Sequence, residues 1–176
     1  MQSPKSFLEQ LNHITTFVFD VDGVLTDGSV YVTETGDTFR QFNIKDGYAL
    51  QLAVKCGYQV CIISGANAES GRIRMNRLGV KDVYIGCKDK VAVFNNYLAE
   101  KQLAAASVLY MGDDIPDLKV MQLAGLPVCP ADAVEEIKAI CNYISSVPGG
   151  KGCARDVIEK VLKVQGKWLN AEAYSW

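Results

Sequence analysis

The sequence has 176 residues, 49% of them hydrophobic and 22% charged, as expected of one globular domain with its own core. A net charge of −2 and a pI near 5.4 exclude a generally basic surface, so we expect no nucleic acid partner. No apolar run approaches the roughly 20 residues of a membrane span, and the N-terminus lacks the apolar core of a signal peptide. We therefore expect a cytoplasmic protein with no membrane partner and a single domain, residues 1–176.

Apolar runs alternate with helical patterns along the chain, which predicts an α/β fold, a Rossmann-like three-layer sandwich around a mainly parallel sheet. The expected strands are 15–19, 59–63, 82–85, 108–111, 126–129 and 143–145. The expected helices are about 46–56, 67–78, 88–102, 116–124, 132–141 and 152–165. Two β-prone runs surround Gly36, so residues 29–44 are predicted to form a β-hairpin flap after the first strand.

Local signals predict where several helices begin and end. Gly125 follows a helical pattern at a position that favours a left-handed residue. Asp114 is expected to cap the helix that follows it. Asp132 with Glu135 resembles a capping box, which predicts a helix start at Asp132. The aromatic tail, about 166–176, carries no clear signal.

Polar residues stand beyond the ends of the expected strands and at the start of one helix. They are Asp20 and Asp22, Ser64, Asp113 and Asp114, and Lys90. In an open parallel sheet, ligands bind beyond the carboxyl ends of the strands. We therefore expect these side chains to converge on one rim of the sheet.

This set of residues suits phosphoryl transfer, because its transition state needs positioning and positive counter-charge. Asp20 is predicted to attack phosphorus and form a mixed anhydride. Asp22 can protonate the leaving oxygen and later activate water. Ser64 and Lys90 are expected to hold the phosphoryl group, although Ser64 could instead cap the next helix.

A divalent cation is also expected, because two carboxylates cannot approach each other and a phosphate without one. We predict Mg²⁺ with Asp20, Asp22 and Asp113 as protein ligands, and with Asp114 and Asp117 supporting them. The six cysteines show no compact metal-ligand spacing, and none is followed by an arginine six residues later. A structural zinc site and cysteine phosphatase chemistry are therefore not expected.

Four segments resemble, in order, the motifs of the haloacid dehalogenase superfamily: FDVDGVLTDG (19–28), IISG (62–65), Lys90 and GDDIPD (112–117). Asp22 favours the phosphatase branch over the halide-cleaving branch, which lacks an acid there. FNIKDGYALQLA (42–53), PGGKG (148–152) and VQGKW (164–168) resemble the family of 3-deoxy-D-manno-octulosonate 8-phosphate phosphatases. This resemblance implies hydrolysis of that phosphorylated 3-deoxy-2-ulosonic acid through an aspartyl-phosphate intermediate, in lipopolysaccharide precursor synthesis.

The resemblance further implies a capless subunit that forms a homotetramer through its hairpins. Each active site would be partly roofed by a neighbour, including the neighbour's C-terminal tail. The sequence supports the capless interpretation independently, since a hairpin, helices and strands already fill residues 21–63 and 65–89. Even a small domain needs about 50 residues. Self-association is then the simplest way to exclude water from the site.

Substrate-binding residues also follow from the resemblance: Lys45, Asp46, Gly47, Gly65, Arg72, Lys151 and Arg155. Four of them have a structural alternative. Lys45 and Asp46 fit a solvated pair, and Lys151 and Arg155 fit an exposed loop and an exposed helix.

One position departs from the family pattern. Many members carry arginine directly after the Ser/Thr-Gly of the second motif, where this chain has Ala66. A bidentate carboxylate clamp from that position is missing, although Arg72 or Arg74 on the same helix could replace it.

Two other functions stay open at this point. A nonulosonate 9-phosphate shares the acid and polyol features of the octulosonate. A receiver-like signalling module would accept phosphate on Asp20 and keep it. Asp22 has no purpose in such a module, because a lasting acyl phosphate should lack a nearby hydrolytic base.

Overall fold

Six strands form the central sheet in a computed structural model that describes residues 6–175. They are β1 (Thr16–Phe19), β4 (Gln59–Ile63), β5 (Asp82–Tyr84), β6 (Val108–Met111), β7 (Leu126–Cys129) and β8 (Tyr143–Ile144). All neighbouring strands run parallel, in the order β5-β4-β1-β6-β7-β8. The predicted Rossmann-like α/β fold is confirmed, and each strand lies within one residue of its expected range.

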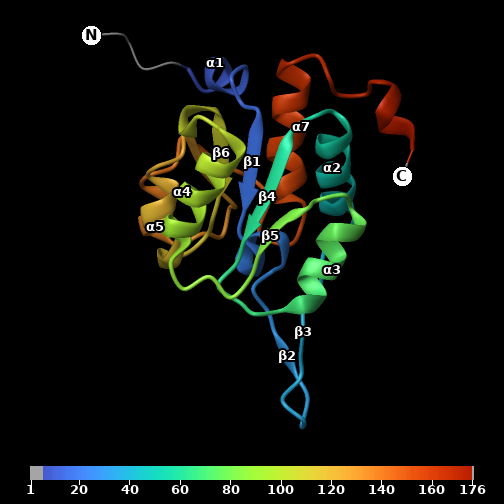
Figure 1. Cartoon of the computed structure of the whole chain (residues 1–176), viewed down its shortest axis with the longest axis vertical. Coiled ribbons are helices and arrows are strands. Elements are labelled where there is room, and N and C mark those ends of the chain that lie inside the picture. The colour runs from blue at the N-terminus through green and yellow to red at the C-terminus, as the bar shows by residue number, and fades with distance from the viewer. Residues whose placement is uncertain (1–5, 176) are drawn as a thin grey trace.

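Helices cover both faces of this sheet (Figure 1). They are α1 (Phe7–Leu11), α2 (Ile44–Lys55), α3 (Glu69–Arg77), α4 (Lys90–Lys101), α5 (Ile115–Met121), α6 (Glu135–Lys138) and α7 (Cys153–Val164), with 3₁₀ turns η2 (Ala105–Ser107) and η3 (Ala171–Tyr174). Helices α2, α3 and α7 lie on one side of the sheet, and α4 and α5 lie on the other. None of the helices within residues 6–175 is long and apolar enough to cross a bilayer.

Side chains of the sheet alternate between two apolar cores. In β1, Phe17 and Phe19 pack in the core with α2 and α7, whereas Val18 packs with α4 and α5. All four residues of β1 are buried, as expected of a strand covered on both faces. The residue that follows this strand, Asp20, is therefore placed at the carboxyl end of the sheet by a rigid element.

A hairpin projects beyond that end of the sheet (Figure 1). Its strands β2 (Tyr31–Val32) and β3 (Thr38–Phe39) pair antiparallel, and Gly36 has a φ of 84° in the turn between them. The hairpin lies inside the predicted 29–44 segment, although the paired strands are short. Between β1 and β5 the chain forms only this hairpin, the turn after β1, α2, β4 and α3, so no cap domain is inserted there.

Two predicted helix signals serve other purposes. Helix α6 begins at Glu135, and the Asp132 carboxylate instead accepts the N–H of Gly149 at 2.9 Å. The predicted helix start at Asp132 was therefore wrong, because the side chain holds a neighbouring loop. Gly125 has no left-handed φ, and a Cβ there would collide with the backbone of Ala106. Close backbone packing, not a helix cap, requires glycine at that position.

The two ends of the described chain pack on the body of the domain. Helix α1 was not expected, although Ser6 and Glu9 form a capping box that the sequence pattern contains. At the other end, η3 packs against α2, and the Tyr48 hydroxyl donates to the Ala173 carbonyl at 2.5 Å. This C-terminal segment lies at the end of the molecule opposite the hairpin (Figure 1).

Candidate active site

A pocket of about 320 Å³ opens at the carboxyl ends of β1, β4 and β6. Its lining contains Asp20, Asp22, Ser64, Gly65, Ala66, Lys90, Asp113, Asp114 and Asp117. The topology thus brings together every residue that was predicted to be catalytic or to lie at the metal. Of the predicted substrate-binding residues, all of them described, only Gly65 lines this pocket.

A larger hollow of about 440 Å³ lies at the other end of the sheet. Ile14, Ser107 and Leu126 in its lining precede or begin strands β1, β6 and β7. Neither a carboxylate nor a lysine belongs to this lining. The hollow therefore lacks the groups that phosphoryl transfer requires, and the smaller pocket is the candidate site.

Asp20 lies at the centre of the pocket. Its backbone N–H donates to the Met111 carbonyl of β6 at 3.0 Å, and its Oδ1 lies 3.1 Å from Lys90 Nζ. Burial, with the charge of Asp117, raises the pKa of Asp20 to about 8, although the charge of Lys90 opposes this increase. A carboxylate in this position needs a further cation to remain ionised at neutral pH.

Lys90 is held in place by a buried polar cluster. Its Nζ lies 2.8 Å from Asp117 Oδ1, which also accepts the Tyr110 hydroxyl at 2.8 Å. Burial lowers the pKa of Lys90, but the charges of Asp20 and Asp117 outweigh burial and raise it, so the ammonium stays charged. Asp117 therefore directs Lys90 toward Asp20, a positioning role that the sequence motif alone does not specify.

Three carboxylates form a group that could hold a metal ion. Oxygens of Asp20, Asp113 and Asp117 lie within 4.8 Å of one another. Burial, followed by the charges of Asp117 and Asp114, raises the pKa of Asp113 to about 7. Hard oxygen ligands crowded in this way fit Mg²⁺, which relieves their mutual repulsion. Asp20 and Asp113 were predicted as ligands, whereas Asp117 was expected only to support them.

The carboxylate of Asp22 lies outside this group. It belongs to the turn η1 (Val21–Leu25) after β1 and is bound by Arg40, which directly follows β3. Arg40 Nε donates to Asp22 Oδ1 at 2.6 Å, and Nη2 donates to Oδ2 at 3.2 Å. The geometry gives no support to the Asp22 carboxylate as a metal ligand, but it leaves Asp22 in the pocket lining as an acid or base.

Glycines make the turn after β1 possible. Gly23 has a φ of +83°, and a Cβ there would overlap the Asp113 carboxylate. A Cβ on Gly149 would overlap the carbonyl oxygen of Gly23. The next residue, Gly150, donates its N–H to the Val24 carbonyl at 2.9 Å. The PGGKG segment therefore packs directly against the turn after β1 and supports its shape.

Ser64 directly follows β4 and is buried. Its Oγ accepts the N–H of Ala66 at 3.2 Å, and helix α3 begins only at Glu69, so Ser64 does not cap that helix. Asp114 caps α5 as predicted, since its carboxylate accepts the N–H of Ile115 at 2.7 Å. The hydroxyl of Ser64 remains at the pocket wall, where a phosphoryl oxygen could meet it.

Known proteins resemble this chain over most of its length. Residues 80–155 match the family model for haloacid dehalogenase-like hydrolases. The 3-deoxy-D-manno-octulosonate 8-phosphate phosphatase of Escherichia coli strain K12 is 34% identical, over 96% of this chain and 89% of its own. The chain belongs to the 3-deoxy-D-manno-octulosonate 8-phosphate phosphatase family. The family predicted from the motifs is therefore confirmed.

Solved structures of this family match the fold closely. The crystal structure of the Yersinia pestis phosphatase has a TM-score of 0.89 and 34% identity, and covers 91% of this chain and 86% of its own. The Moraxella catarrhalis phosphatase, solved with a magnesium ion, a phosphate ion and a KDO molecule, has a TM-score of 0.88 and 30% identity, with 92% of each chain covered. Membership of a hydrolase family favours turnover over the receiver-like alternative.

Asp46 and Arg155, which were predicted to bind substrate, lie between α2 and α7 and not in the pocket lining. Asp46 is buried, and its Oδ1 accepts the N–H of Arg155 at 2.7 Å at the start of α7. Burial raises the pKa of Asp46 to about 6, while backbone N–H groups of α7 oppose the increase. The Arg155 guanidinium lies over the rings of Tyr48 and Trp168, at 5.6 and 5.4 Å from their centroids. Both residues fasten α7 to α2 within this subunit.

Other predicted substrate residues of the family are placed on α2 and α3. Gly47 is buried, and a Cβ there would lie 2.7 Å from Arg74 Nη2, so the glycine makes room for that guanidinium. Arg72 Nε pairs with Glu69 at 3.3 Å within α3. Neither Arg72 nor Arg74 lines the pocket. Within this subunit, therefore, neither takes the place of the arginine that many family members have at the position of Ala66.

Lys45 and Lys151 are exposed. Lys151 Nζ lies 3.3 Å from an Asp27 carboxylate oxygen, and the lysine side chain is 58% exposed. Both lysines lie outside the pocket lining, so within one subunit the structure does not bring them to the phosphate site.

Proposed function

We propose that this chain hydrolyses 3-deoxy-D-manno-octulosonate 8-phosphate, the activity for which its E. coli relative is named, and that it uses Mg²⁺, the ion present in the Moraxella catarrhalis structure. One observation carries the proposal: Asp20, Lys90 and Asp113 meet in a single pocket at the carboxyl end of the sheet. The proposal includes a cytoplasmic location and a place in lipopolysaccharide precursor synthesis. The product would be the free sugar acid and inorganic phosphate.

In the first half-reaction, a carboxylate oxygen of Asp20 attacks phosphorus, and the bond from phosphorus to the sugar oxygen breaks. Asp22 donates a proton to that leaving oxygen. In the second half-reaction, Asp22 takes a proton from water as the water attacks the aspartyl phosphate. Phosphate leaves, and the Asp20 carboxylate is restored.

The remaining groups of the pocket position the phosphoryl group. Lys90 supplies a buried positive charge 3.1 Å from the nucleophile, and Ser64 supplies a hydroxyl. Mg²⁺ held by Asp20, Asp113 and Asp117 would neutralise phosphate charge and keep these carboxylates ionised.

A panel of phosphate esters with Mg²⁺ tests the substrate. We expect octulosonate 8-phosphate to have the highest kcat/KM, far above glycerol phosphate and other simple esters. A nonulosonate 9-phosphate belongs in the panel because Ala66 removes the arginine usual at that position. Preference for the nine-carbon ester would change the substrate and keep the enzyme class, whereas equal turnover of all esters would refute sugar-acid specificity.

We also propose that the subunits form a homotetramer through their hairpins. The support is a row of exposed apolar side chains on and beside the hairpin: Tyr31, Val32, Phe39 and Ile44 are 58% to 68% exposed. The hairpin projects freely from its own subunit (Figure 1). In such an assembly the exposed Lys45 and Lys151 could reach the sugar-acid carboxylate of a neighbouring site.

The C-terminal tail, about residues 166–175, is bound to a helix of its own subunit. Lys55 Nζ donates to the Ser175 carbonyl at 2.9 Å, and the Tyr48 hydroxyl donates to Ala173, so the tail is held on its own α2. It lies at the end of the molecule opposite the hairpin (Figure 1), whereas the pocket lies at the carboxyl ends of β1, β4 and β6. If the tail contributes to any active site, we propose that the site belongs to another subunit.

Sedimentation velocity tests the assembly. We expect a tetramer for the native chain and smaller species for Val32→Glu, because a charge would be buried in the contact. Leu8→Glu is the matched control, since Leu8 is 62% exposed on α1 and should leave the tetramer intact. A native monomer, or a tetramer that Val32→Glu leaves unchanged, would contradict hairpin-mediated assembly.

A further inference from the structure

The pair between Arg40 and Asp22 is more than a surface salt bridge. Two N–H groups of the Arg40 guanidinium donate to the two carboxylate oxygens of Asp22. This bidentate pair fixes both the position and the plane of the carboxylate. The Arg40 side chain is only 11% exposed, whereas Asp22 is 35% exposed and lines the pocket. The guanidinium therefore lies behind the acid, on the side away from solvent.

The surroundings of Arg40 hold it in this position. It lines a small hollow whose other walls include Val21, Phe42 and Ser64, so its stem packs between the nucleophile turn and the chain that leaves the hairpin. A further hydrogen bond of 3.4 Å joins Nη1 to the Thr38 hydroxyl of β3. Because Arg40 directly follows β3, on the stretch of chain that leads from the hairpin to α2, it links the flap to the acid.

This link affects where the acid can lie. Asp22 is two residues from Asp20 and lines the same pocket as the three carboxylates that could hold a cation. The bidentate pair keeps it outside the group formed by Asp20, Asp113 and Asp117. Each carboxylate oxygen has two lone pairs, so the pair with Arg40 leaves acceptor capacity on both oxygens for a proton.

We infer that Arg40 is a positioning residue for acid–base catalysis: it holds the Asp22 carboxylate where it can exchange a proton with the leaving oxygen. The inference rests on the proposed function, in which Asp22 is the general acid. The flap then has a role in chemistry through Arg40, in addition to any role in assembly.

Leaving-group dependence tests this inference, because a general acid matters most when the leaving oxygen is strongly basic. The first irreversible step, phosphoryl transfer to Asp20, is reported by kcat/KM. For Arg40→Gln we expect kcat/KM to fall roughly 10- to 100-fold with the sugar phosphate or another alkyl phosphate. With p-nitrophenyl phosphate, whose leaving group needs little protonation, we expect a fall of less than about threefold.

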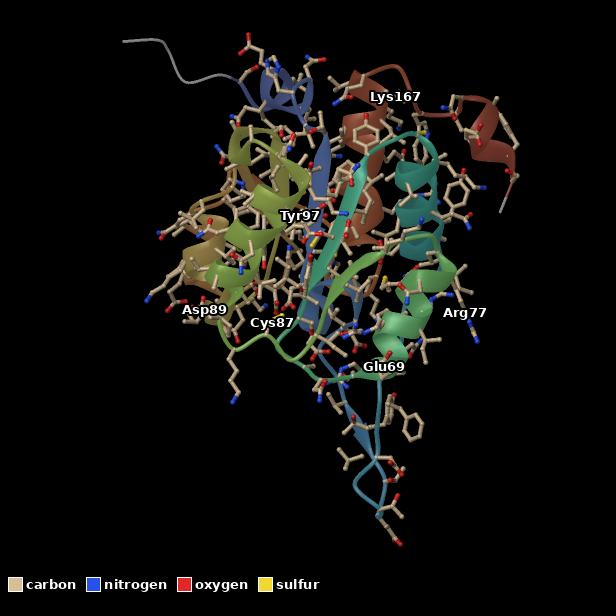
Figure 2. All side chains as sticks on the ribbon, in the orientation of Figure 1. Glu69, Arg77, Cys87, Asp89, Tyr97 and Lys167 are labelled. Carbon is tan, nitrogen blue, oxygen red and sulfur yellow. The ribbon has the colours of Figure 1, made fainter. Side chains whose placement is uncertain are left out.

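Two variants serve as controls for the loss of charge. Arg40→Lys keeps one charge-assisted hydrogen bond without the fork and should fall between native and Arg40→Gln with alkyl phosphates. Arg77→Gln removes an exposed arginine on the outer side of α3 (Figure 2) and should leave both substrates unaffected. Equal losses with aryl and alkyl phosphates in Arg40→Gln would overturn the inference, since a general loss of structure or of phosphate binding has no leaving-group preference.

A double-mutant comparison separates this inference from the proposed function. In an Asp22→Asn background, Arg40→Gln should cause no further fall with alkyl phosphates, because the acid it positions is absent. Multiplying losses would overturn the inference and leave the acid in place. If Asp22→Asn alone leaves alkyl phosphates unaffected, the assignment of Asp22 as the acid fails, and the inference fails with it.

Discussion

Asp20 and Asp46 are both buried aspartates in which burial raises the pKa, but they lie in different surroundings. Asp20 opens onto a pocket and has two further carboxylates within reach of the same ion. Asp46 lies between α2 and α7 and accepts a backbone N–H at the start of α7. Burial of a charge alone therefore does not mark a site. Crowding with other acids at a pocket does.

The same contrast explains why only one of the two regions needs a ligand. At the pocket, like charges face one another, and Lys90 cannot balance them all. At the seam between α2 and α7, Arg155 packs against two aromatic rings, and Asp46 meets a helix N-terminus. The acids in the pocket are left without enough positive charge, so they can bind a cation. The charged groups between α2 and α7 already have partners, so they stabilise the fold.

Replacement of the nucleophile should have the largest effect. In Asp20→Asn the amide cannot form the acyl phosphate, so we expect kcat to fall by at least about 10³-fold. The metal-free variant should melt no lower than the native protein, because a buried charge with an unfavourable environment is removed. Initial rates with Mg²⁺ and thermal unfolding measure both. Substantial residual turnover would contradict the role of Asp20.

Replacement of Asp22, the proposed general acid, should have the second largest effect on turnover. In Asp22→Asn we expect kcat to fall roughly 10²- to 10⁴-fold, because neither the leaving oxygen nor the attacking water exchanges its proton with the side chain. Phosphorylation of Asp20 should continue slowly, and intact-mass spectrometry of quenched samples would detect the phosphorylated chain. Full activity in this variant would remove Asp22 from the mechanism.

The seam between α2 and α7 should respond in stability instead of turnover. Asp46→Ala removes the acceptor at the start of α7, so we expect a loss of roughly 1–3 kcal/mol in the free energy of unfolding. Under conditions where it stays folded, its kcat should remain within about twofold of native. The neighbouring Lys45→Ala, at an exposed position, should change stability by less than about 0.5 kcal/mol. Denaturant unfolding compares them. A large fall in kcat with native stability would move Asp46 into the active site.

A smaller effect concerns pH and the metal. In the metal-free fold the pKa values of Asp20 and Asp113, about 8 and about 7, lie above the ordinary value of 3.8. The folded state thus binds more protons than the unfolded state between about pH 4 and 8, and these two groups lower stability as pH rises through that window. Because Mg²⁺ binds the ionised carboxylates, we expect the increase in Tm on adding Mg²⁺ to be larger at pH 8 than at pH 6. Asp113→Asn should reduce that increase. An equal or larger increase at pH 6 would argue against a metal on these acids.

The sequence predicts the groups at the strand ends well, for a physical reason. Parallel strands deliver the residues that follow them to one rim, so Asp20, Ser64 and Asp113 converge whatever the details of the loops. Arg40 has no comparable signal, because its partner lies across the hairpin and depends on how the flap folds back. The position of Asp46 could not be predicted for the same reason. Its side chain on α2 meets the start of α7 through a tertiary contact that leaves no local pattern in the sequence.

The central claim is that a covalent phosphoryl group forms on Asp20. Reduction with borohydride converts an aspartyl phosphate to homoserine, which peptide mass spectrometry can locate in the chain. Asp22→Asn, quenched during turnover with Mg²⁺ and the sugar phosphate, should contain homoserine at position 20. Phosphate release without any modification at position 20, or homoserine at a different aspartate, would contradict the mechanism.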